Sequence, residues 1–171
     1  MNDQDAYRLI LASEMNDFEL GKMLFKEYAE SKGFDLSYQN FEQELIKINT
    51  QYNQPSGGLI LIKKGEMAVG CGGIRQFGES VAELKRMYIQ PEHRGKGLGK
   101  QLLNKLIDLA RKLQYERIWL DTLESLETAT HLYRSSGFTE MEAYRFNPHT
   151  DVLYFEYNLT TTGSQSPDRL K

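Results

Sequence analysis

The sequence has few of the residues that build disulfide frameworks and metal sites. Its 171 residues include one cysteine, Cys71, and three histidines, His93, His131 and His149. A single cysteine excludes an internal disulfide and a cysteine-based zinc site. The histidines lack the spacing of metal ligands, so no metal is expected. Cys71 lies in a strand-like run without a histidine nearby, which favours a small buried residue over a nucleophile.

A large excess of charge of one sign is also missing. The net charge is −3, from 21 lysines and arginines against 24 aspartates and glutamates, which argues against a general affinity for nucleic acid. No apolar run reaches the length of a membrane span, and no signal peptide is expected. We therefore expect a cytoplasmic protein that binds neither membranes nor nucleic acid. Its 40% of hydrophobic residues is enough for the core of one domain.

The hydrophobic pattern predicts a single mixed α/β domain. The order is strand, two helices, three strands, helix, strand, helix and two strands. The strand–helix–strand in the middle predicts a right-handed parallel crossover, and the remaining pairs are expected to be antiparallel. The domain should span residues 1–159, and residues 160–171 have no apolar anchor and are expected to form a disordered tail. The expected strands are 7–12, two within 58–77, 81–90, 117–122, 138–146 and 152–159. Four helices are expected: one capped by Ser13, one from Phe41 to Ile48, one after Gly97 and one capped by Ser125.

The stretch RGKGLG, residues 94–99, places three glycines and two cations between a strand and a helix. Glycines adopt positive φ, so successive backbone N–H groups can point at one anion, which the N-terminus of a helix also favours. The Walker pattern is excluded because Gln101 follows Lys100, and the glycine spacing G-x-G-x-G differs from the dinucleotide fingerprint. On its own the loop is equally typical of a phosphate cradle and of a flexible corner.

The residues around this loop decide between the two readings. Arg94-x-x-Gly97-x-Gly99 matches the [Q/R]-x-x-G-x-[G/A] motif, and the chain resembles the GNAT superfamily of N-acetyltransferases over residues 7–159. The resemblance implies acetyl-CoA as the donor and a mostly antiparallel sheet of six or seven strands, with helices on both faces and a splay between the fourth and fifth strands. It rests on ELKRMYIQPEHRGKGLG (83–99), LDTLESLETATHLYRSSGF (120–138), GFDLSYQNFEQEL (33–45) and the closing YRFNP and LYFEYNL segments. The implied contacts to the pyrophosphate are the backbone N–H groups of Arg94, Gly95, Lys96, Gly97, Leu98, Gly99 and Lys100.

The parity of the fourth strand independently predicts a splay. In strict alternation Leu84 faces away from Met87 and Ile89. If all three belong to the core, an extra residue is needed, and a β-bulge near Lys85–Arg86 would supply it. The bulge would separate this strand from its parallel neighbour. By the resemblance, the freed edge at Met87, Tyr88 and Ile89 pairs with the pantetheine arm like an added strand.

The resemblance also supplies two catalytic candidates. Amine acetylation needs a base for the amine and an acid for the departing thiolate. Glu83, at the start of the splayed strand, is the candidate base, directly or through water; the alternative is a solvated residue or a partner of Lys85 or Arg86. Tyr133, in the LY-x-x-x-GF pattern, is the candidate acid; the alternative is a core tyrosine beside Leu132.

One position departs from the family pattern. Leu126 stands where many members have an asparagine that contacts the cofactor, so backbone or water must replace that contact. The acceptor site is expected between the first two helices and the last hairpin. Asp35 could attract a cationic amine or serve as a turn residue. The expected acceptor residues are Phe34, Asp35, Gln39 and Tyr144.

These features predict an enzyme that transfers an acetyl group from acetyl-CoA directly to a primary amine of a small molecule or peptide. One alternative is a non-catalytic acetyl-CoA-binding regulatory module, against which Tyr133 argues. The other is a protein- or RNA-modifying acetyltransferase, although RNA would need an extended basic surface. The acceptor and a homodimeric state are left open, since one fold serves many substrates.

Overall fold

The computed structural model describes residues 6–33 and 40–160, which form a seven-stranded sheet in the spatial order β1-β2-β3-β4-β5-β7-β6. Only the β4–β5 pair is parallel among these strands. The predicted mixed, mostly antiparallel sheet is therefore confirmed. The strands are β1 (Tyr7–Leu11), β2 (Gly58–Lys64), β3 (Met67–Gln76), β4 (Val81–Ile89), β5 (Arg117–Leu123), β6 (Thr139–Met141) and β7 (Val152–Asn158).

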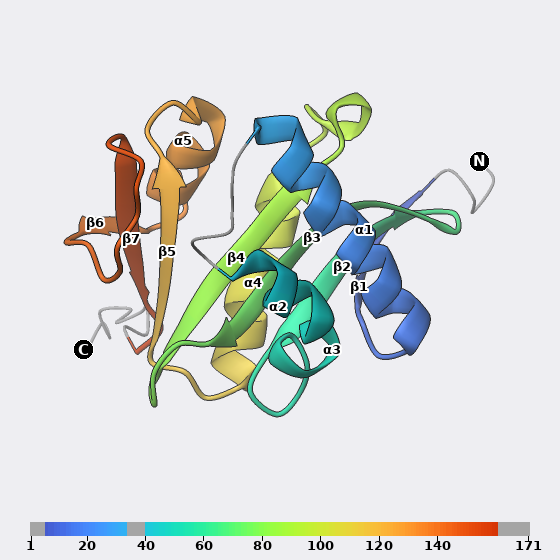
Figure 1. The fold of residues 1–171 in the computed structure, drawn as a ribbon, viewed down its shortest axis with the longest axis horizontal. Coiled ribbons are helices and arrows are strands. Elements are labelled where there is room, and N and C mark those ends of the chain that lie inside the picture. Colours follow the sequence, from blue (N-terminus) through green and yellow to red (C-terminus); the bar gives the residue numbers. More distant parts are fainter. Residues whose placement is uncertain (1–5, 34–39, 161–171) are drawn as a thin grey trace, which may run out of the picture.

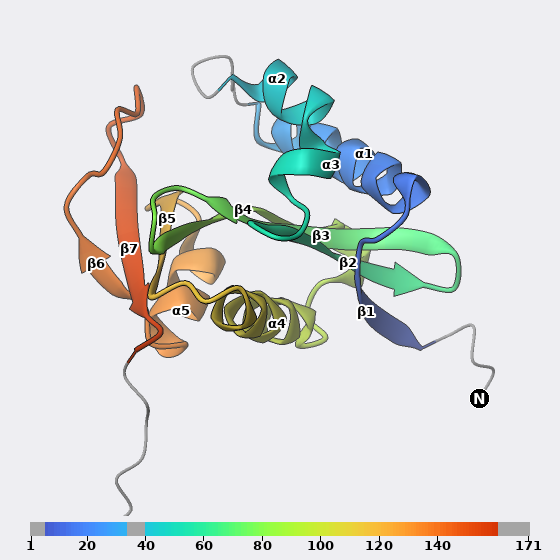
Figure 2. The same ribbon diagram turned by 90° about the horizontal axis from the view of Figure 1, so that it is seen from below.

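Helices cover both faces of the sheet, with α1, α2 and α3 on one face and α4 and α5 on the other (Figures 1 and 2). On the α4 face, Leu102 and Leu106 are fully buried against the sheet, and on the α1 face Phe25 and Tyr52 are fully buried. None of the helices in residues 6–33 and 40–160 has the length and apolar character to cross a membrane. The helices are α1 (Met15–Lys32), α2 (Phe41–Ile46), α3 (Ile48–Gln51), the short 3-10 helix η3 (Pro91–His93), α4 (Leu98–Lys112) and α5 (Glu127–Ser135).

Four local predictions about where helices and strands begin or end were wrong. The helix expected from Phe41 to Ile48 is interrupted at Lys47, which ends α2 and precedes α3. The N-cap of α5 is Leu126 rather than Ser125, and the N-cap of α1 is Glu14 rather than Ser13. The strand expected over 138–146 ends at Met141, because the residues after it turn toward the start of β4 and make side-chain contacts there.

The predicted bulge and splay are confirmed. Opposite Gly72 of β3, β4 has two residues, Arg86 and Met87, because Cys71 pairs with Tyr88 and Gly73 pairs with Lys85. Arg86 has a φ of 58°, which is rare for a residue with a side chain. Parallel pairing with β5 covers only Val81↔Arg117 to Glu83↔Trp119. Beyond this point β4 stays with β3 and β5 with β7, so the two strands diverge (Figure 1).

A hydrogen bond from Cys71 of the neighbouring strand β3 stabilises the bulge. The Sγ of Cys71 donates this bond, of 3.3 Å, to the carbonyl oxygen of Arg86. The thiol is fully buried, and burial raises its pKa, so it stays protonated. Leu84 lies in the α4-side core, and Met87 and Ile89 pack against the same core, as the parity argument requires. Cys71 is thus the small buried residue that the sequence predicted.

Candidate active site

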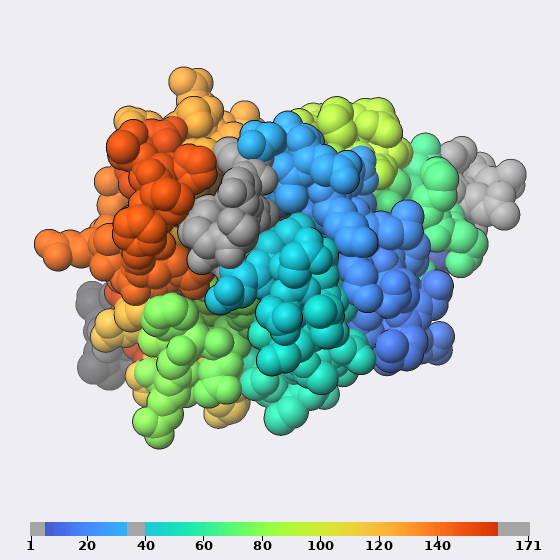
Figure 3. All heavy atoms as spheres, in the orientation of Figure 1, coloured from blue at the N-terminus to red at the C-terminus, as the bar shows by residue number. Residues whose placement is uncertain are grey.

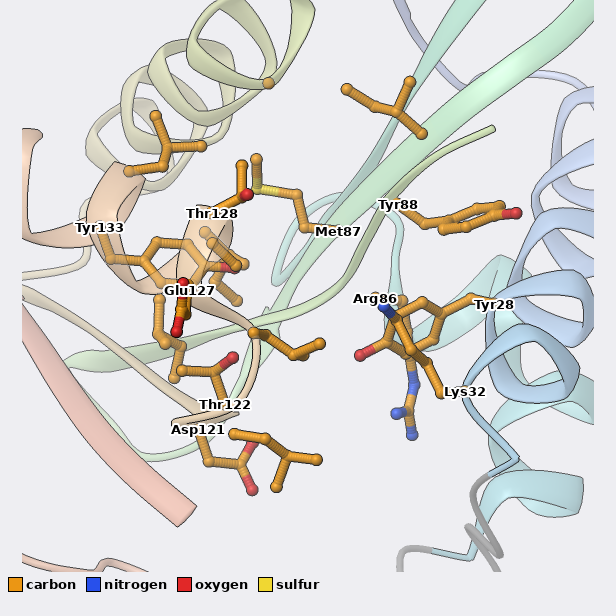
Figure 4. A pocket seen from close by; sticks show the side chains of 18 of the residues that line it. Tyr28, Lys32, Arg86, Met87, Tyr88, Asp121, Thr122, Glu127, Thr128 and Tyr133 are labelled. Carbon is orange, nitrogen blue, oxygen red and sulfur yellow. The ribbon is translucent and has the colours of Figure 1, made fainter. Parts of the chain in front are cut away.

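A cavity of about 600 Å³ lies where β4 and β5 diverge, in the size range of small-molecule sites. Its walls come from α1, the second half of β4, the loop before α4, the end of β5, the start of α5 and the loop before β7. In Figure 4 the side chains of Tyr28, Lys32 and Arg86 lie on one side of the opening, and those of Asp121, Glu127 and Tyr133 lie on the other. In the space-filling view of Figure 3, the α1–α3 layer lies on one side of the face that is drawn, and the segment after β6 lies on the other side.

The glycine loop forms one rim of this cavity. Gly95 and Gly97 both have a φ of +75°, and Gly97 is the N-cap of α4, where no side chain caps the helix. A residue with a Cβ would be strained at either position. Gly99 differs, since an added Cβ would make only an ordinary contact, 3.5 Å from Leu132. The loop therefore depends on two of its three glycines for its conformation.

The cationic side chains of the loop bind their own turn. Arg94 Nε donates to the carbonyl oxygen of Ile89 at 2.8 Å, and Lys96 Nζ donates to that of Glu92 at 3.1 Å. These bonds brace the loop against the end of β4. With both side chains bonded within the loop, the contact of backbone N–H groups with an anion here stays a prediction.

Tyr133 lies on α5 and lines the cavity. Its ring packs against Phe138 and Phe155, with centroids 5.7 and 6.0 Å away, so it is also a core tyrosine. Burial raises the pKa of its hydroxyl, and Tyr28 and Asp121 raise it further. The phenol is therefore protonated at neutral pH and can donate a proton into the cavity.

Glu83 has surroundings that differ from those expected of a base. Its side chain is fully buried: Arg75 donates to Oε1 at 3.1 and 3.0 Å, and Tyr144 donates to Oε2 at 2.8 Å, where Arg145 also forms an ion pair. Burial raises the pKa of Glu83, but Lys85, Arg145 and Arg75 outweigh this effect and hold the pKa at about 2. A general base needs a raised pKa. Glu83 borders a second, smaller hollow rather than the cavity at the splay.

Of the expected acceptor residues, only Tyr144 can be located. Its ring packs against Trp119 and Phe77, each with centroids 5.1 Å away, and its hydroxyl is bonded to Glu83. It does not line the cavity at the splay. Phe34, Asp35 and Gln39 lie outside the residues that the structure describes.

A buried ion pair that the sequence did not reveal joins the two diverging strands. Glu83 and Trp119 are the last residues that pair between β4 and β5. Lys85 and Asp121 lie two positions beyond them, and their charged atoms are 3.9 Å apart. Asn147 donates to the other Asp121 oxygen at 3.3 Å. Burial and the neighbouring Arg86 lower the pKa of Lys85 to about 8, although Glu83 and Asp121 favour its charged form. Both Lys85 and Asp121 line the cavity.

A second buried ion pair fixes the bulge to α2. Arg86 donates to both oxygens of Glu44, at 3.1 Å through Nε and 2.7 Å through Nη2, and Tyr52 donates to Glu44 at 2.6 Å. Glu44 and Arg86 belong to two of the sequence segments that carry the family resemblance, which include FEQEL and ELKRM. No spacing rule connects residues 42 positions apart, so the pairing could be found only in the structure.

The comparisons with known proteins agree with this geometry. A family model, Acetyltransferase (GNAT) family, matches residues 21–138. The chain belongs to the GNAT acetyltransferase family. An uncharacterized N-acetyltransferase of Schizosaccharomyces pombe is 37% identical over 153 residues, which cover 88% of this chain and 91% of that protein. One from Dictyostelium discoideum is 26% identical over 200 residues, covering 81% and 93%.

Solved structures of the GNAT fold superpose on most of the chain. A GNAT acetyltransferase from Staphylococcus aureus has a TM-score of 0.74 at 20% identity, covering 90% of this chain and 99% of that one. The Salmonella typhimurium protein yncA, solved with its cofactor acetyl-CoA, has a TM-score of 0.66 at 18% identity, covering 97% and 100%. At these identities the likeness shows the fold alone.

Within this GNAT acetyltransferase, Leu126 lines the cavity as the N-cap of α5 and makes no side-chain cap. An asparagine at this place could cap the helix and bind a polar group, whereas leucine offers only an apolar contact. The neighbouring Thr128 and Glu127 also line this wall and bring polar atoms to it. The departure from the family pattern thus changes one contact and leaves the wall itself in place.

Proposed function

We propose that this GNAT acetyltransferase binds acetyl-CoA in the cavity between β4 and β5 and transfers the acetyl group directly to a primary amine of a small molecule or peptide. The observation that supports this proposal is the position of Tyr133, a buried, protonated phenol in a cavity whose rim is the glycine loop. An acid in this place is what the departing thiolate would need.

The cavity residues fit such a donor. Beyond Glu83, the edge of β4 that faces β5 borders the cavity, so the backbone of Met87 to Ile89 would hold the amides of a pantetheine arm in the manner of an added strand. The positive-φ glycines Gly95 and Gly97 and the N-terminus of α4 would hold the pyrophosphate at the rim. Both expectations follow from the backbone and require no particular side chain.

When bound, acetyl-CoA would supply the acetyl group and a thiolate as leaving group. The hydroxyl of Tyr133 would protonate that sulfur, since its raised pKa keeps the proton available until charge develops nearby. The base role of Glu83 remains a hypothesis with little support from its surroundings, because its pKa is about 2 and four donors already bind it. We propose instead that Glu83 positions the start of the splay through Arg75, Arg145 and Tyr144.

The test is release of CoA from acetyl-CoA in the presence of amines. Amino acids, polyamines, aminoglycosides and peptides would be supplied in turn, and the acetylated product identified by mass spectrometry. We expect amine-dependent CoA release with at least one class. Calorimetric binding of acetyl-CoA without release by any amine would instead support a non-catalytic binding module, and absence of binding would overturn the proposal altogether.

A further inference from the structure

The second hollow, which Glu83 borders, lies near the start of β4, at the end of this strand opposite the glycine loop (Figure 1). Its volume is about 470 Å³, within the range of small-molecule sites. Its walls come from α3 and the turn after it, the end of β3, the start of β4 and the segment before β7. Among the described residues, none lines both this hollow and the cavity proposed for acetyl-CoA.

Arg145 is the residue of this hollow whose hydrogen bonding is incomplete. Its side chain is 19% exposed, and within residues 6–33 and 40–160 it makes one hydrogen bond, from Nη2 to Oε2 of Glu83. Its Nε is buried and has no partner there. A guanidinium carries several N–H donors in one plane, and a buried donor without an acceptor costs free energy. Most N–H donors of Arg145 therefore have no acceptor among these residues.

Glu83 has no capacity left to accept them. Its Oε1 accepts two hydrogen bonds from Arg75, at 3.1 and 3.0 Å, and its Oε2 accepts one from Tyr144 at 2.8 Å besides that from Arg145. These bonds occupy the roughly four lone-pair sites of a carboxylate. In the described part of the chain, no other carboxylate forms an ion pair with Arg75 or Arg145. An anionic group in the hollow would give Arg145 the acceptor it lacks.

Phe77 gives the same hollow an apolar side. Its ring packs against Trp119 and Tyr144, with centroids 5.3 and 5.1 Å away, yet 41% of the residue is exposed. The guanidinium of Arg145 lies 5.8 Å from the centroid of the Phe77 ring. An aromatic ring that packs on Phe77 would therefore bring a carboxylate attached to it within reach of Arg145.

We propose that the second hollow binds a small aryl carboxylate, with its ring on Phe77 and its carboxylate on the guanidinium of Arg145. The two oxygens of a carboxylate match the planar fork of a guanidinium. A cationic ligand would be repelled by Arg75 and Arg145, and an uncharged ligand would leave the charge of Arg145 without a partner. The ligand is either the acceptor itself, through its anionic end, or a separate molecule that does not react.

The first experiment compares three probes that differ in charge and in the ring. Phenylacetate, its uncharged amide phenylacetamide and acetate are titrated into the protein at pH 7 by calorimetry. We expect phenylacetate to bind at least about tenfold more tightly than either of the others. It should also change the fluorescence of Trp119, the single tryptophan, which packs on Phe77. Equal affinities of phenylacetate and its amide, or no binding of phenylacetate at millimolar concentration, would overturn the inference.

The second experiment removes the charge. Arg145→Gln should lower the affinity for phenylacetate about tenfold and leave that for phenylacetamide unchanged. Arg75 and Tyr144 still bind Glu83 in this variant. Its control is Arg134→Gln, since Arg134 is about half exposed and lines neither cavity. An Arg145→Gln variant that binds phenylacetate as tightly as the wild type, or an equal loss in the control, would contradict the proposed contact.

A third variant removes the ring and leaves every charge in place. Phe77→Leu should lower the affinity for phenylacetate about tenfold, since a leucine offers no flat face. It tests the site even where Arg145→Gln does not fold. Phe146→Leu is its control, because Phe146 is 81% exposed and does not line the hollow. Equal affinities of the two phenylalanine variants would overturn the placement of the ring.

A rate measurement then distinguishes the two sources of the carboxylate. CoA release from acetyl-CoA and an amine is measured with increasing phenylacetate. Competition with the amine would assign the hollow to the acceptor, and an unaltered KM for the amine would assign it to a separate ligand; both results agree with the site. Binding of phenylacetate by a protein that releases no CoA with any amine would count against the proposed function and leave this inference standing.

Discussion

Replacing Glu83 by glutamine separates the two roles considered for this residue. If Glu83 positions the start of the splay, Glu83→Gln should cost folding stability, because Arg75 and Arg145 would face one another without the carboxylate between them. If Glu83 is the base, the variant should fold normally and fail in turnover. The geometry favours the first result.

The size of the effect follows from the pKa of Glu83. Its folded value is about 2 against an ordinary value of 4.5, and the difference corresponds to about 3 kcal/mol of preferential stabilisation of the ionised form. Breaking a buried ion pair by removing one partner typically costs about 3–5 kcal/mol, which agrees. Because the folded pKa is lowered, this stabilisation is complete above pH 4.5 and is lost as the pH falls toward 2. At pH 3 less than half of this stabilisation should remain.

Urea unfolding at pH 7 and pH 3 measures this difference. Trp119 is the single tryptophan and packs on Tyr144, so its fluorescence reports on the region around Glu83. Glu140→Gln is the matched control, since the Glu140–Arg134 pair is about half exposed and should contribute under about 1 kcal/mol. A Glu83→Gln variant as stable as the wild type at pH 7, or a stability gap that does not narrow at pH 3, would refute the positioning role. A stable variant with turnover lowered by 10²-fold or more would establish the base role.

Three further substitutions test other parts of the site. Tyr133→Phe should keep the affinity for acetyl-CoA by calorimetry and lower kcat by about 10²-fold, because the ring stays packed while the proton donor is lost; unchanged kcat would remove the acid role. Gly97→Asp should weaken acetyl-CoA binding at least about tenfold, because of strain at φ +75° and a misplaced charge. The control Gly65→Asp, in the β2–β3 turn at φ +59°, should leave the affinity unchanged. A Gly97→Asp variant that binds acetyl-CoA as tightly as the wild type would reject the loop assignment. Glu44→Gln should lower the free energy of unfolding by about 3–5 kcal/mol in urea, because it leaves Arg86 buried without its carboxylate, and a loss below about 1 kcal/mol would contradict this reasoning.

The sequence predicted those features that depend on neighbouring residues. The alternation of Leu84, Met87 and Ile89 was enough to locate the bulge, since a strand has a fixed two-residue period. The glycine loop before α4 was predicted for a similar reason, because positive φ strongly favours glycine. In these cases the physical cause lies within a few residues of its effect.

The charge network could not be predicted in this way. Glu83 meets Arg75 across the β3–β4 pair and Arg145 from the loop before β7, 62 residues away. Lys85 meets Asp121 only because the parallel register aligns Glu83 with Trp119. Each contact depends on a register or a loop path that the one-dimensional pattern does not contain. The motif around Tyr144 marks it as a candidate site residue, but its contact with Glu83 depends on the same three-dimensional information.

The bulge also explains how two adjacent cations reach one side of the sheet. In a regular strand Lys85 and Arg86 would face opposite sides. At positive φ, Arg86 instead joins Lys85 on the side of α1–α3, where it pairs with Glu44, while Leu84 and Met87 both pack on the α4 side. The same extra residue parts β4 from β5. One inserted position therefore opens the edge proposed for the donor and also brings two adjacent cations to the same side of the sheet, where each forms a buried ion pair.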